Sequence, residues 1–163
     1  RASVAAELEL QEWGTICNVW ALKQRLGDAT HRYIVVALEN QTLYFAVDGE
    51  DVQQIQHLGA PDVKSLAWAT LTNGCLVQVW SGGVNYIRPD SDRGTQTWNG
   101  PGIQLAAVNG RQLVVVQKER TVVYFELDAS DNWDERGTKT FADEVKCLDV
   151  LPLLPTADGK EEL

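Results

Sequence analysis

The sequence has no methionine and no long apolar run. A membrane-spanning helix needs about 18 or more consecutive apolar residues, and a secretory signal peptide needs a shorter apolar stretch near the start. Neither pattern occurs in the 163 residues. We therefore expect no membrane association and no leader peptide. Because the chain starts with Arg1 and lacks an initiator methionine, we also expect it to be an excised fragment of a longer protein.

Cysteine and histidine are also scarce. Cys17, Cys75 and Cys147 are odd in number and far apart, and their spacing fits neither a disulfide framework nor a zinc site. We expect three reduced thiols in the core of a cytosolic or nuclear protein. His31 and His57 have no activated serine or cysteine beside them, which argues against a catalytic triad. The sequence therefore predicts a non-catalytic protein without a cofactor.

Basic residues are in the minority. The chain has 14 of them against 23 acidic residues, so its formal net charge is −9. Such a charge creates an unfavourable field for a phosphate backbone, and we expect no direct binding of nucleic acid by this segment. The apolar fraction of 44% and the charged fraction of 23% are ordinary for globular domains, which argues against disorder.

Short runs rich in β-branched and aromatic residues dominate the chain after its first thirty residues, and no segment there has a helical pattern. Two Asn-Gly pairs, at Asn73-Gly74 and Asn109-Gly110, separate such runs. Asn-Gly supplies the positive φ angles of tight hairpins, so we expect antiparallel strand pairs joined there. The fold class that these signals predict is all-β.

Three hairpins recur along the chain, at 33–48, 75–90 and 112–128. Their starts lie 42 and 37 positions apart. A period of about forty residues is the length of one four-stranded propeller blade. We expect strands at 63–71, 75–80, 83–88 and 95–98, then at 103–108, 112–116, 121–127 and 133–141, with another blade starting at 144–150. The chain thus holds about three blades, fewer than the four to eight of a closed ring.

Two aromatic residues and an acidic loop are candidate partner contacts. Trp98 and Trp133 fall on or beside outer strands with polar neighbours, where packing at the sheet edge is the favoured interpretation and partner contact is the second. The loop contributes Asp128, Asp131 and Asp134. Its oxygen pattern does not fit a calcium loop, because Trp133 and Lys139 replace the glycine and the glutamate that such a loop needs at its sixth and twelfth positions. We therefore expect no metal here.

From about Val19 to Leu151 the chain resembles the large triple-propeller subunits of splicing factor three-b, damaged-DNA-binding protein, and the cleavage and polyadenylation specificity factor. The likeness is a diffuse pattern at matched spacing, without a catalytic signature. The residues that carry it are Leu76 to Asp90, Trp98, Pro101-Gly102, Asn109 to Val115, and Val123 to Asp128.

The resemblance implies a protein with three seven-bladed propellers. Residues 1–20 would be the end of the first propeller, with its last strand at 7–10, and a linker. Residues 21–163 would be the opening blades of the second propeller, an incomplete ring. The implied partners are the remaining blades of the same protein and other protein subunits of a large complex in the nucleus.

Two functions follow from this resemblance. The first is a non-catalytic, protein-binding scaffold subunit of the splicing factor three-b complex in pre-mRNA splicing. It is favoured by Ile87-Arg88-x-Asp90, by Trp98 followed by Pro101-Gly102, and by Tyr124-Phe125-Glu126-x-Asp128. The alternative is a propeller adaptor of a cullin-type ubiquitin ligase of the damaged-DNA-binding protein type. The segment 145–153 looks closer to that adaptor.

Overall fold

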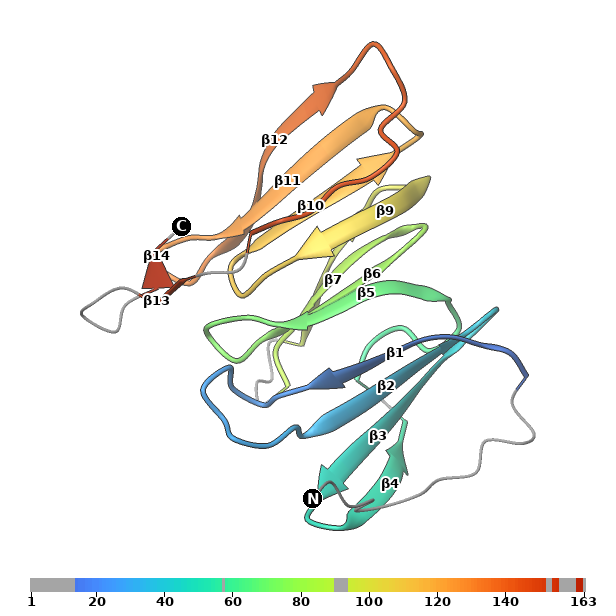
Figure 1. Cartoon of the computed structure of the whole chain (residues 1–163), viewed down its shortest axis with the longest axis vertical. Coiled ribbons are helices and arrows are strands. Elements are labelled where there is room, and N and C mark those ends of the chain that lie inside the picture. The colour runs from blue at the N-terminus through green and yellow to red at the C-terminus, as the bar shows by residue number, and fades with distance from the viewer. Residues whose placement is uncertain (1–13, 57, 90–93, 152–153, 156–160, 163) are drawn as a thin grey trace.

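Antiparallel β-sheets make up the molecule. The computed structural model describes residues 14–56, 58–89, 94–151, 154–155 and 161–162, and within these ranges it contains strands and no helix. It follows that no described segment offers a helix suited to crossing a membrane. Twelve of the strands form three four-stranded sheets, shown in Figure 1. The prediction of an all-β fold with about three four-stranded antiparallel blades is confirmed.

Each sheet is a meander in which consecutive strands pair, and we call the three sheets blades 1 to 3 in chain order. Blade 1 contains β1 (Ile16–Leu22), β2 (Tyr33–Leu38), β3 (Thr42–Asp48) and β4 (Asp51–Ile55). Blade 2 contains β5 (Ser65–Thr70), β6 (Leu76–Trp80), β7 (Gly83–Ile87) and β8 (Thr95–Asn99). Blade 3 contains β9 (Ile103–Val108), β10 (Gln112–Gln117), β11 (Thr121–Leu127) and β12 (Trp133–Thr140). A separate short pair joins β13 (Leu154–Pro155) to β14 (Glu161–Glu162).

The two Asn-Gly turns differ in backbone conformation and in the hydrogen bonds that close them. At the β5–β6 turn, Gly74 has the expected positive φ of 80°, and the Asn73 side-chain oxygen accepts the backbone N–H of Cys75 at 3.1 Å. At the β9–β10 turn, neither Asn109 nor Gly110 has a positive φ. That expectation is wrong, because the Asn109 side chain closes the turn itself by accepting the backbone N–H groups of Arg111 and Gln112, both at 2.8 Å.

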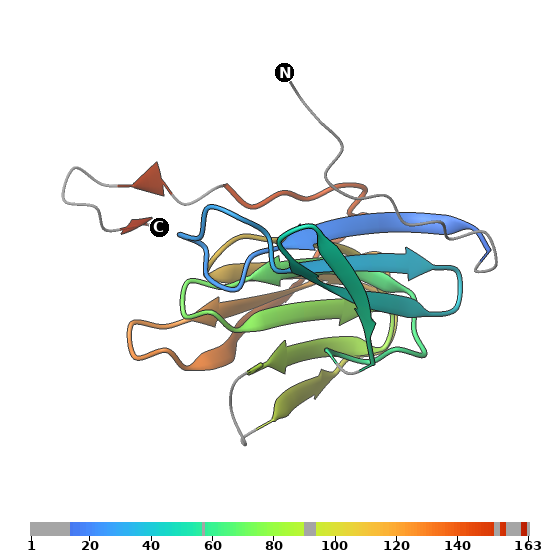
Figure 2. The ribbon, with the colours of Figure 1, turned by 90° about the horizontal axis from the view of Figure 1, so that it is seen from below.

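The blades stack face to face with their first strands innermost. The strands β1, β5 and β9 contact one another in succession, and Figures 1 and 2 show the sheets layered in that order. The apolar layer between blades 1 and 2 includes Val35, Tyr44 and Trp68. The larger layer between blades 2 and 3 includes Val77 and Val115, both with 0% exposure. Burying a valine this completely stabilises the fold by about 1.5–3 kcal/mol.

A buried polar side chain fixes the connection between blades 1 and 2. Gln78 on β6 has 0% exposure, and its amide oxygen accepts the backbone N–H of Ala60 at 2.8 Å while its amide nitrogen donates to the Ala60 carbonyl at 2.9 Å. The same amide group bonds to Ser65 on β5 and Asn85 on β7. Gly59 is needed here, because a Cβ atom at this position would lie 2.5 Å from the Gln78 oxygen. A fully satisfied network of this kind holds the inter-blade segment in one position.

The start of the first blade differs from the expected boundary. Residues 16–20, assigned from the sequence to the linker, belong to β1 and pair with β2. The strand expected at 7–10 lies outside the described residues, as does His57. His31 is exposed.

The segment 144–150, expected to start another blade, is not a strand. No described residue pairs with it, and a strand requires a hydrogen-bonded neighbour. It is nevertheless held against blade 3, because the backbone N–H of Val145 donates to the Glu119 carbonyl at 2.7 Å and the Asn109 side chain donates to the Leu151 carbonyl at 2.8 Å. Similar hydrogen bonds between turns, accepted by the carbonyls of Ser81 and Gly110, link blade 3 to blade 2.

The cysteines also differ from expectation. All three are free, but Cys17 and Cys147 are exposed and Cys75 is only partly buried. Exposure follows from position, since Cys17 lies on the mostly exposed strand β1 and Cys147 lies in the unpaired segment after β12. The expectation of three core thiols is therefore wrong.

Candidate partner-contact surface

Trp133, a candidate contact for which the sequence favours edge packing, is a core residue with 6% exposure. It starts β12 opposite Leu127, and its side chain faces blade 2. Its ring stacks on Tyr86 of blade 2 at 5.7 Å and on Phe125 of blade 3 at 6.0 Å between centroids, with interplanar angles of 3° and 7°. For Trp133 the structure thus agrees with the interpretation of edge packing, because packing between blades determines which way this residue points.

Trp98 is half-buried on β8 and also joins blades 2 and 3. Its ring meets Phe125 edge to face at 5.1 Å. Its indole N–H donates to the Glu135 carboxylate on β12 at 3.0 Å. One part of the ring therefore packs between blades, while the remaining part stays accessible at their outer edge.

Asp128 closes the turn between β11 and β12. Its carboxylate accepts the backbone N–H groups of Ser130 and Asn132 at 2.8 and 2.9 Å, and Arg136 lies 3.2 Å away. These hydrogen bonds, above all those from Asn132, hold the pKa of the Asp128 carboxyl below its usual value. The same turn places Asp131 at a φ of 60°, in the left-handed region that aspartate tolerates. This loop is a side-chain-stabilised turn.

Asp131 and Asp134 are both exposed beside this turn. A β-bulge between Tyr124 and Phe125 leaves Arg136 as an extra residue on β12, and its guanidinium reaches Glu126 and Asp128. Sequence reasoning missed this bulge. The structure thus brings the accessible edge of Trp98, Glu135 and the acidic turn to the same outer edge of blades 2 and 3.

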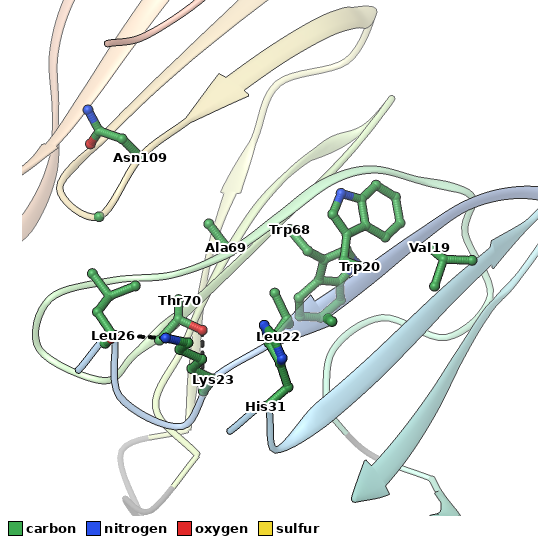
Figure 3. A pocket seen from close by; sticks show the side chains of 12 residues that line it. Val19, Trp20, Leu22, Lys23, Leu26, His31, Trp68, Ala69, Thr70 and Asn109 are labelled. Atoms are coloured by element: carbon green, nitrogen blue, oxygen red, sulfur yellow. Dashed lines mark hydrogen bonds between the residues drawn. The ribbon is translucent and has the colours of Figure 1, made fainter. Parts of the chain in front are cut away.

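A pocket of about 440 Å³ opens at the inner strands, where blades 1 and 2 meet the β9–β10 turn (Figure 3). Its wall combines Trp20 and Trp68 with the β1–β2 loop. The polar groups of that loop are bonded internally, since Lys23 donates to the Leu26 carbonyl at 3.3 Å and Thr70 donates to the Lys23 carbonyl at 2.7 Å. The polar side chains on this wall include Lys23, His31 and Thr70, and none of the described lining residues carries a carboxylate or a thiol.

Consecutive four-stranded meanders that stack face to face, with first strands innermost, define a β-propeller module. The candidate contacts lie on outer strands and turns of this module, and no cluster of three potential metal-binding side chains occurs in the described part of the chain. The class of protein is therefore a β-propeller.

The comparison with known families gives the particular family. The family model described as the RSE1/DDB1/CPSF1 second beta-propeller matches residues 4–159. The chain belongs to this family, which confirms the resemblance inferred from the sequence.

Curated relatives agree with this assignment. Splicing factor 3B subunit 3 of Drosophila melanogaster is 34% identical over 147 residues, covering 87% of this chain and 12% of the relative. Spliceosome-associated protein 130 A of Arabidopsis thaliana is 31% identical over 83% of this chain and 11% of its own length. Pre-mRNA-splicing factor rse1 of Emericella nidulans is 32% identical over 81% and 11%. The chain thus spans only about a tenth of the length of these relatives.

Proposed function

We propose that this chain is part of a non-catalytic scaffold subunit of the splicing factor 3b complex, acting in pre-mRNA splicing in the nucleus. The observation that supports it most directly is the 34% identity to splicing factor 3B subunit 3 over 87% of the chain. The plant and fungal relatives at 31% and 32% identity also carry splicing names.

The physical character of the segment supports protein contacts rather than RNA contacts. Its net charge of −9 opposes a phosphate backbone, so RNA binding is left to other subunits. A propeller presents outer strands and turns on a packed core, and such a surface can hold partner proteins without a change in shape.

We propose the outer edge of blades 2 and 3 as the partner contact. Its members are the accessible edge of Trp98 and the exposed carboxylates of Asp131 and Asp134. An aromatic anchor within a polar rim is a common composition of an interface hot spot, whose truncation costs about 2 kcal/mol or more. Trp133 contributes by packing rather than by contact, because it is buried.

A second candidate function is an adaptor of a cullin-type ubiquitin ligase. The family description that matches the chain groups DDB1 with RSE1 and CPSF1, so family membership alone is compatible with either role. The relatives that carry splicing names favour the splicing role over the adaptor role.

Affinity purification of the full-length protein from nuclear extract, followed by mass spectrometry, separates the two functions. Recovery of splicing factor 3b subunits in near-stoichiometric amounts would support the scaffold. Recovery of a cullin without splicing proteins would refute it. A Trp98→Ala/Asp131→Ala/Asp134→Ala variant tests the surface, with Glu39→Ala, an exposed residue on blade 1, as the control. We expect reduced recovery of a partner only with the triple variant.

A further inference from the structure

A small basic pocket lies at the end of blade 2 where the β1–β2 loop packs against it. Its volume is about 220 Å³, and its walls are Gln24 and Arg25 from that loop, the turn 73–75, and Arg88 with Pro89 after β7. Segments some fifty residues apart in the sequence thus form one concave site. None of these wall residues is acidic.

The two guanidinium groups of this pocket have no carboxylate partner within the described chain. The ion pairs there use Arg32, Arg136 and Lys146 instead. Asp28 lies near the pocket, but its carboxylate accepts the backbone N–H of Arg25 at 2.8 Å rather than pairing with the guanidinium. Because acidic residues outnumber basic ones by 23 to 14, two arginines that have no carboxylate partner among the described residues are an unusual feature of this surface.

The pocket is also organised before any ligand arrives. The Arg88 guanidinium carbon lies 4.6 Å from the centroid of the Tyr86 ring, a cation–π contact. Tyr86 is itself fixed, since it is 1% exposed, stacks on Trp133, and accepts a hydrogen bond from the Asn73 side chain at 2.9 Å. A guanidinium held in place loses little conformational entropy when it binds an anion.

We propose that this pocket binds a carboxylate side chain of an acidic protein segment. Arginine forks bind carboxylates in a bidentate manner, and two arginines can hold one or two such groups. The volume is smaller than the roughly 300–1,000 Å³ of typical small-molecule sites and suits a side chain. The net charge of −9 repels an extended polyanion, whereas a single carboxylate can enter a locally positive pocket. This inference goes beyond the proposed function, because it does not depend on which complex contains the protein.

The test is a fluorescence anisotropy titration of the full-length protein with a labelled peptide that carries one glutamate among glycine and serine residues, at low salt. We expect Arg25→Ala/Arg88→Ala to weaken binding at least tenfold, and Arg25→Lys/Arg88→Lys to weaken it less. The matched control is Arg120→Ala, an exposed arginine in the β10–β11 turn, which should change affinity less than twofold. Arg25→Ala alone keeps the test independent of folding, because the exposed Arg25 side chain has no hydrogen-bond or ion-pair partner within the described chain, and it should weaken binding severalfold.

Two outcomes would overturn the proposal. The first is an affinity that is equal in the wild type and in the Arg25/Arg88 double variant, or no peptide binding at all. The second is tighter binding of a uridine-rich RNA oligomer than of the peptide through the same arginines.

Discussion

Replacing Trp133 by alanine should loosen the interface between blades 2 and 3. The ring is 6% exposed and stacks on Tyr86 and Phe125 from the two blades. Removing a buried tryptophan in this way costs about 3–5 kcal/mol, because the stacking contacts are lost and a cavity remains. Each 1.36 kcal/mol corresponds to a factor of ten, so local opening should become about 100-fold or more frequent.

Hydrogen exchange of the full-length protein, followed by mass spectrometry, measures this effect where it occurs. Peptides from β7, β10 and β11 should exchange faster, whereas peptides from β2 and β3 of blade 1 should keep their protection. Trp98→Ala is a matched comparison, since that ring makes one edge-to-face contact at 5.1 Å and a partly exposed hydrogen bond. It should cost only about 1–2 kcal/mol.

The reasoning would be refuted if Trp133→Ala left the protection of β7 and β11 unchanged while reducing partner recovery. That result would mean that Trp133 acts at a surface. Equal effects of the Trp98 and Trp133 substitutions on exchange would also contradict the assignment of Trp133 to the core.

Three further predictions concern residues away from this interface. Gln78→Leu should destabilise blade 2 by about 3 kcal/mol or more, because it removes a partner of the buried Ser65 hydroxyl and of the part-buried Ala60 N–H, and exchange of residues 59–65 should accelerate. Gly59→Ala should lower the free energy of unfolding by about 1–3 kcal/mol, since its Cβ would lie 2.5 Å from the Gln78 oxygen. In a thermal melt the control Gly27→Ala, whose Cβ would have nothing within 4 Å, should be neutral. The pKa of Asp128 is lowered in the folded protein. Its ionised carboxylate therefore stabilises the fold above the ordinary pKa of 3.8, and this contribution is lost as the pH falls through the lower folded pKa. An NMR titration of Asp128 with a midpoint at or above 3.8 would contradict this.

The strands and their repeat could be predicted from the sequence because they depend on short-range preferences. The run Thr121–Leu127 is rich in β-branched and aromatic residues, the run Ile103–Val108 is mostly apolar, and the observed bounds of both are those expected. The period of about forty residues indicated propeller blades before any contact between blades was known. The family resemblance indicated that these blades belong to the second propeller of a larger protein, and the family match over residues 4–159 confirms this assignment.

The candidate site could be predicted only in part. The acidic turn at Asp131 and Asp134 is exposed, as its polar composition suggested. The direction of Trp133 could not be predicted, because it depends on the aromatic rings of Tyr86 and Phe125 in two different strands. The bulge that leaves Arg136 without a cross-strand partner on β11 has no clear signal in the sequence.

The basic pocket illustrates what the tertiary structure alone decided. Arg25 and Arg88 are far apart in the chain, and nothing in their local sequence indicates that they line one cavity. They meet because the β1–β2 loop of blade 1 packs on the Asn73-Gly74 turn of blade 2. By itself the sequence determined the strands of blades 2 and 3, the places of their hairpin turns and the repeat, since these rest on local backbone preferences. Which side chains meet between blades depends on register and packing among distant segments, and these exist only in the folded chain.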